Sequence, residues 1–126
     1  MQTGTSAYNF YTLPREQVRA GVERCAFRGD GVIAVMNWID GGNDVRPHTH
    51  EFEQVVMILA GTARYHVADQ VFDCVPGTVL RVPAGQVHFI EVTGKERVLN
   101  LDLFSPVRED YLHLVAYQKE FGQGDS

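Results

Sequence analysis

Short hydrophobic runs follow one another along most of the chain, and residues that favour turns separate them. The runs occupy residues 22–27, 32–39, 54–59, 62–67, 71–75, 78–82, 87–92 and 97–104. Eight or nine short strands at this spacing are typical of an all-β sandwich or barrel. No helical segment of ten or more residues lies between the runs to carry a parallel crossover, so we expect antiparallel sheets.

The two ends of the chain have a different pattern. Weak alternation over residues 1–13 predicts an extended arm, and Pro14 favours a short helical turn over residues 14–18. An arm needs a surface to lie against, and in small β domains that surface is often a second copy, so we expect a homodimer.

After Pro106 the hydrophobic period becomes helical, with Tyr111, Leu114 and Val115 on one face. This pattern predicts a C-terminal helix over about 108–119. The 126 residues therefore form one domain, with an N-terminal arm over 1–21 and a barrel over about 22–104.

Composition and charge argue against several classes of partner and site. The net charge of −5 and the scattered basic residues argue against nucleic acid as a partner. The longest apolar run, residues 55–60, is too short to cross a bilayer, and no secretory signal precedes the first strand, so we expect a cytoplasmic protein without a membrane partner. Cys25 and Cys74 are too far apart for a metal knuckle and are expected to be packed free thiols.

Histidines supply the candidate chemistry. His48 and His50 are two residues apart and would share one face of a strand, and Gln54 has the same parity. His88 comes from a later strand that barrel closure can bring opposite them. Imidazole suits Zn, Fe, Ni or Mn, so the pattern predicts one divalent metal ion. The alternatives are solvated or purely structural histidines, and Glu53 is disfavoured as a ligand by its opposite parity.

Two blocks of landmarks carry a family resemblance. Residues 42–61 read G-x5-H-x-H-x3-Q-x6-G, and residues 77–88 read G-x5-P-x-G-x2-H. This pattern resembles the cupin superfamily, whose fold is a double-stranded β-helix, or jelly-roll barrel, with a metal inside. The resemblance implies His48, His50, Gln54 and His88 as the metal ligands. Gln54 stands where many cupins have Glu, which favours Lewis-acid chemistry over oxygen activation.

The last predicted strand has one polar face. Asn100 and Asp102 alternate with Leu99, Leu101 and Leu103. Three leucines on one face normally mark the core side, so Asn100 and Asp102 are expected to face either solvent or a polar cavity.

The segment 101–112, together with H-x-H-x3-Q, is similar to small cupins of the KdgF type. These act in pectin and alginate breakdown and convert a 4,5-unsaturated monouronate to its linear keto form. The resemblance implies that Asp102 acts as general base or acid, Phe104 packs on the sugar ring and Arg108 binds the carboxylate. Apart from this resemblance, the residues themselves favour plainer roles: Asp102 as a solvated carboxylate, Phe104 as a core aromatic residue and Arg108 as a surface cation at the start of a helix.

The sequence thus favours a metal-dependent enzyme that opens or isomerises a small sugar acid. A cupin dioxygenase or lyase acting on another small metabolite is the first alternative. A non-enzymatic metal-binding or ligand-binding cupin is the second.

Overall fold

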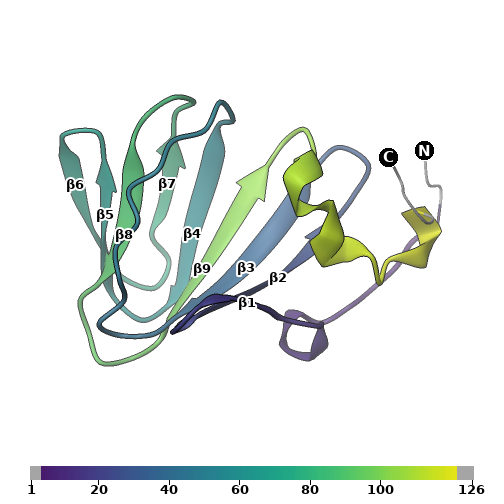
Figure 1. Cartoon of the computed structure of the whole chain (residues 1–126), viewed down its shortest axis with the longest axis horizontal. Coiled ribbons are helices and arrows are strands. Elements are labelled where there is room, and N and C mark those ends of the chain that lie inside the picture. The colour runs from purple at the N-terminus through teal and green to yellow at the C-terminus, as the bar shows by residue number, and fades with distance from the viewer. Residues whose placement is uncertain (1–3, 122–126) are drawn as a thin grey trace.

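The computed structural model describes residues 4–121, which fold into two antiparallel sheets facing each other (Figure 1). The strands are β1 (Glu16–Arg19), β2 (Val22–Arg28), β3 (Ile33–Ile39), β4 (Gln54–Ala60), β5 (Ala63–Val67), β6 (Gln70–Cys74), β7 (Val79–Val82), β8 (His88–Val92) and β9 (Val98–Phe104). This is the predicted all-β jelly-roll barrel. No helix in the described part of the chain is long and apolar enough to cross a membrane.

The larger sheet has the order β1-β2-β3-β9-β4-β7, and the smaller one has the order β6-β5-β8. The segment between β3 and β4 runs along the free edge of β8 (Figure 1). There His48 and His88 exchange two backbone hydrogen bonds of 3.1 and 2.9 Å, and the side chain of Asn43 bonds to the backbone of Ile90 and Val92. This segment therefore extends the smaller sheet and carries two of the candidate ligands.

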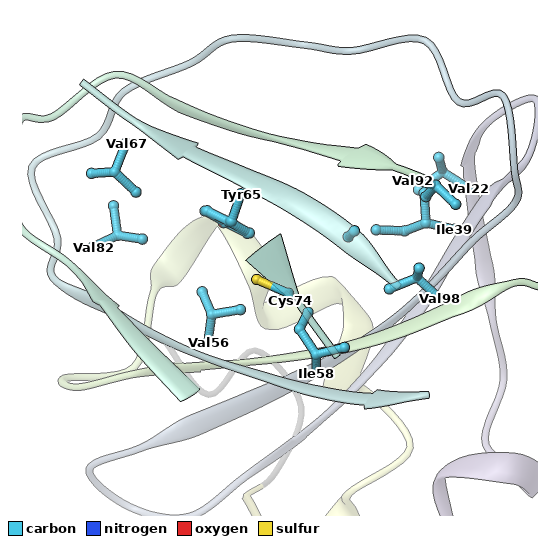
Figure 2. Packing of buried hydrophobic residues seen from close by; sticks show 11 residues of the cluster. Val22, Ile39, Val56, Ile58, Tyr65, Val67, Cys74, Val82, Val92 and Val98 are labelled. Carbon is cyan, nitrogen blue, oxygen red and sulfur yellow. The ribbon is translucent and has the colours of Figure 1, made fainter. Parts of the chain in front are cut away.

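Alternate residues of both sheets fill the space between them (Figure 2). The interior cluster consists of Val22, Ile39, Val56, Ile58, Ala63, Tyr65, Val67, Cys74, Val82, Val92 and Val98. Cys74 belongs to this cluster and Cys25 lies on the opposite face of the larger sheet; both are buried free thiols, as the sequence predicts.

Gly61 makes the tight turn between β4 and β5. Its φ of +77° lies in the left-handed region, and a Cβ there would stand 2.8 Å from the carbonyl oxygen of Arg97. Both constraints favour glycine, which explains in physical terms why the first sequence block ends on this residue.

The N-terminal arm packs on the outer face of its own sheet. Leu13 and Phe10, the latter in the short 3-10 helix η1 (Phe10–Thr12), contact Met36 and Trp38. The arm therefore already has a surface to lie against within its own chain and needs no second subunit for this. The homodimer stays a prediction. The predicted helical turn over 14–18 is wrong, because Glu16–Arg19 forms β1 and pairs with β2.

The C-terminal segment closes one end of the barrel. The predicted continuous helix over about 108–119 is wrong in kind: the chain forms two 3-10 helices, η2 (Glu109–Val115) and η3 (Lys119–Phe121). Gln118 separates them because its buried amide bonds to the backbone N–H and C=O of Arg28, at 2.9 and 3.0 Å. The tail beyond residue 121, expected to fray, lies outside the described residues.

Candidate metal centre

Three histidine side chains converge at one place between the sheets. Their candidate ligand atoms all lie within 4.8 Å of one another, so His48, His50 and His88 can hold a metal ion. His88 is the first residue of β8 and is fully buried. His48 and His50 lie just before β4 rather than on a regular strand, but the extended pairing with β8 keeps the predicted alternation.

Each imidazole has the same hydrogen bond on its Nδ1 atom. His48 Nδ1 lies 2.7 Å from the Arg46 carbonyl oxygen, His50 Nδ1 lies 2.8 Å from that of Phe52, and His88 Nδ1 lies 2.9 Å from that of Gln86. A carbonyl oxygen only accepts, so each Nδ1 donates, and in a neutral ring of this tautomer Nε2 carries the lone pair that a metal ion binds. Second partners of this kind are what orient metal-binding histidines.

The remaining polar atoms suit a cation. His88 Nε2 is buried without a hydrogen-bond partner, and His50 Nε2 lies 3.1 Å from Gln54 Oε1. With the amide oriented in this way, two lone pairs face each other, an arrangement that a positive ion between them would relieve. Burial also lowers the pKa of His88 to about 4, so this ring is neutral at physiological pH and available as a ligand.

Glu53 points away from this group. Its carboxylate pairs with Arg81 on the exposed side of the sheet. The parity argument therefore separates Glu53 from Gln54 correctly, and the donors gathered here are three imidazole rings and one amide, none of which carries a negative charge. A divalent ion held by them would keep its full charge.

A cavity of about 240 Å³ opens beside the histidines. It is lined by Val18, Arg19, Val22, Arg24, Asn37, Ile39, His48, Gln54, Tyr65, Ile90, Asn100, Asp102 and Tyr111. Asn100 and Asp102 therefore face a polar cavity rather than bulk solvent. The leucines that alternate with them lie on the outer face, where Leu99 and Leu101 pack against the cluster under the arm.

Asp102 is held by two amides. Asn37 Nδ2 donates to Asp102 Oδ2 at 3.1 Å, and Asn100 Nδ2 donates to Asp102 Oδ1 at 2.7 Å. Burial raises the pKa of Asp102 to about 6, while hydrogen bonds from Gln54, Asn100 and Asn37 oppose the rise. The carboxyl group can therefore exist in either protonation state near neutral pH.

Phe104 and Arg108 lie at the end of the barrel closed by η2. Phe104 is buried, with its ring centroid 5.7 Å from that of His50. The guanidinium of Arg108 lies 4.6 Å from the Phe104 ring and 4.1 Å from the Tyr111 ring, and it pairs with Asp110 through two hydrogen bonds of 3.1 and 2.7 Å. Arg108 is not among the described residues that line the cavity.

Sequence reasoning missed four polar residues of the cavity wall: Arg19, Arg24, Asn37 and Tyr65. The signal for Arg24 was present, because it shares its parity on β2 with the buried residues Val22 and Ala26. Arg19 follows directly on the predicted helical turn over residues 14–18, so no strand parity is assigned to it. Tyr65 sits in the hydrophobic interior with its hydroxyl 3.5 Å from Gln54 Nε2, and burial raises its pKa well above the usual value.

A family model for the cupin domain matches residues 34–104. The chain is also similar to a solved RmlC-like cupin from Shewanella frigidimarina NCIMB 400, with 24% identity, a TM-score of 0.76 and coverage of 88% of this chain and 99% of that one. Its similarity to KdgF from Halomonas sp. has 25% identity, a TM-score of 0.75 and coverage of 86% and 98%.

The polyketide cyclase RemF from Streptomyces resistomycificus is more distant, with 19% identity, a TM-score of 0.69 and coverage of 83% of this chain and 81% of that one. At this identity the likeness concerns the fold alone. No curated protein matches the sequence.

Proposed function

This chain belongs to the cupin domain family, and from that premise we propose that it is a metal-dependent enzyme that opens the ring of an unsaturated sugar acid. The observation that carries the proposal is the position of Asp102, a partly buried carboxyl group beside Gln54 and inside a polar cavity that His48 also lines. The similarity to KdgF over most of both chains supports this substrate class.

The residues for the metal are His48, His50, Gln54 and His88. A divalent ion held there would supply Lewis-acid stabilisation of negative charge on a substrate oxygen. The backbone carbonyl partners of the three Nδ1 atoms keep the rings in one orientation, which lowers the reorganisation needed on binding.

Asp102 is placed to move the proton. In its ionised form it takes the proton of the anomeric hydroxyl group as the bond between the anomeric carbon and the ring oxygen breaks, which leaves an aldehyde and an enolate. The enolate then takes up a proton at carbon 4 and becomes the keto form, so the reaction neither gains nor loses electrons. A pKa of about 6 suits both halves of this exchange.

The cavity wall offers further contacts for a sugar. Asn100 Oδ1 is buried without a hydrogen-bond partner, so it can accept a bond from a substrate hydroxyl group. Phe104 is buried against His50 and is not among the described residues that line this cavity, so its contact with the sugar stays a prediction.

The test is an anaerobic incubation of the metal-loaded protein with a 4,5-unsaturated monouronate, following the loss of ultraviolet absorbance of the ring double bond. We expect turnover that falls to background after chelation and in His50→Ala, and that returns to the chelated wild type when Zn²⁺, Ni²⁺ or Mn²⁺ is added back. A rate equal to that of the chelated control would refute the proposal. Oxygen uptake with another small metabolite would favour the dioxygenase instead, and intact ligand binding without any turnover would favour a binding protein.

A further inference from the structure

Two arginines line the cavity from β1 and β2, whereas the candidate metal ligands come from β4, β8 and the segment before β4. Arg19 ends β1 and Arg24 lies on β2, whereas Gln54 begins β4 and His88 begins β8. Arg24 pairs in register with Asn37 on β3, which in turn pairs with Asn100 on β9. A polar row therefore crosses the inner face of the larger sheet and ends beside Asp102.

The donors of these arginines are only partly used. Nε and Nη2 of Arg24 both lie 2.7 Å from one oxygen of Glu16. The other N–H groups of its guanidinium remain available to a ligand. Arg19 Nε is buried without any hydrogen-bond partner. Burial lowers the pKa of the Arg19 guanidinium, the direction expected for a cation that lacks full compensation.

Arg108 is compensated more fully than Arg19, and it pairs with both oxygens of its carboxylate, whereas Arg24 contacts one oxygen of Glu16 and the ring of Tyr111 at 4.9 Å. Its two hydrogen bonds to Asp110 already form the paired contact that a substrate carboxylate would need. Its charge also lies over the rings of Phe52, Phe104 and Tyr111, at 4.9, 4.6 and 4.1 Å from the guanidinium carbon. A ligand that recruits Arg108 would first have to displace Asp110.

We propose that Arg19 and Arg24, rather than Arg108, bind the carboxylate of the substrate. This inference rests on the proposed sugar-acid function and names the residues that select the acid. On the sheet, Arg24 is separated from Asp102 by β3, a distance of about two strand spacings or ~10 Å. One pyranose ring and an arginine side chain bridge this gap, so a carboxylate at the arginines leaves the anomeric end beside Asp102.

The experiment measures binding of two unreactive probes, D-galacturonate and its neutral analogue D-galactose, to the metal-loaded full chain by calorimetry. We expect the wild type to prefer galacturonate. Arg19→Gln and Arg24→Gln should each weaken galacturonate binding about 10- to 100-fold, because each removes a charge-assisted hydrogen bond, and should leave galactose binding unchanged. Arg64→Gln, on the exposed face of β5, is the matched control and should behave as wild type.

Arg24→Lys keeps the charge but removes the fork, and we expect it to lose part of the preference while keeping the wild-type melting temperature. This second variant keeps the inference testable if Arg24→Gln folds poorly.

Loss of the preference in Arg108→Gln, with the preference intact in the Arg19 and Arg24 variants, would overturn the inference and leave the sugar-acid function standing. A wild type that binds both probes equally would also overturn it. Turnover of the unsaturated monouronate, measured in parallel, then shows whether the proposed function falls with it.

Discussion

On the outer face of the larger sheet, Met36 and Trp38 of β3 are buried beneath Leu13 of the arm, and the guanidinium of Arg15 lies 3.7 Å from the centre of the Trp38 ring. On the inner face, the same strand turns Asn37 towards the cavity, where it bonds to Asp102. The arrangement departs from the usual alternation, because a hydrophobic cluster lies outside the barrel and polar side chains occupy part of its interior.

This contrast shows how a chain of 126 residues keeps a polar cavity without losing its core. The arm adds a second hydrophobic cluster on the outside, so the barrel interior does not have to supply all of the stabilising burial. Stability and activity should then depend on different faces of the same strands, and single substitutions can test that separation.

The largest effect is expected on the inner face. Asp102→Asn keeps the size of the side chain but removes the group that exchanges the proton, so turnover of the unsaturated monouronate should fall about 10²- to 10⁴-fold. Its melting temperature should change little, because the loss of a carboxylate disfavoured by burial offsets the loss of one of the two hydrogen bonds that Asn37 and Asn100 donate to Asp102. Turnover and thermal unfolding measured on the same preparation check both statements; a variant that unfolds easily would contradict the separation of the two faces.

The next effect belongs to the outer face. Trp38→Ala should lower the free energy of unfolding by about 3–5 kcal/mol, because it empties a buried aromatic site between the sheet and the arm. Denaturant unfolding measures this loss, and Trp38→Phe, which retains most of the packing, is the control. At a temperature where the variant is folded, its turnover should match the wild type; reduced turnover there would mean that the two faces are coupled.

An effect of intermediate size concerns the inner face again: the dependence of the unfolding free energy on pH, measured in the chelated protein. The raised pKa of Asp102 means that the folded state holds a proton between pH 4 and 6 that the unfolded state has lost, so this group makes stability fall as pH rises. The lowered pKa of His88 has the opposite effect: over about pH 4 to 6.5 it makes stability rise with pH, because there the unfolded state binds the extra proton. Each contribution is about 3 kcal/mol, so they nearly cancel.

Asp102→Asn should unmask the contribution of His88. Relative to wild type, the free energy of unfolding of the chelated variant should rise by about 3 kcal/mol between pH 4 and 6.5. Denaturant titrations across this range give the difference directly, and parallel wild-type and variant profiles would show that burial does not shift the pKa of Asp102.

The smallest effect concerns Arg15, whose stacking on Trp38 is partly exposed. Arg15→Ala should cost about 0.5–1 kcal/mol of unfolding free energy and leave turnover unchanged. Glu23→Ala removes the ion-pair partner of Arg15 but keeps the stacking, so it separates the two contributions. An equal loss in both variants would assign the effect to the ion pair.

The strand pattern and the parity of the candidate ligands could be predicted from local sequence. His50 lies four positions before Gln54, the first residue of β4, and the two side chains meet as their shared parity predicts, whereas Glu53 has the opposite parity and faces Arg81. The left-handed turn at Gly61 is likewise a local property.

Other features depend on contacts between distant segments. The residues around Tyr111 have helical periodicity, but Gln118 bonds to the backbone of Arg28 and the segment forms two 3-10 helices. Glu16–Arg19 has no strong strand pattern and becomes a strand because the edge of β2 offers it hydrogen bonds.

Local sequence thus determined the antiparallel strands and the shared parity of His48, His50 and Gln54, because alternation and turn chemistry act over a few residues, whereas His88 joins them through the closure of the barrel. Only the tertiary structure decided that Asn100 and Asp102 face a cavity and that Arg19 and Arg24 share it. The face of a strand that becomes the interior depends on what covers the other face, and here the cover is an arm more than twenty residues away from Trp38 in the sequence.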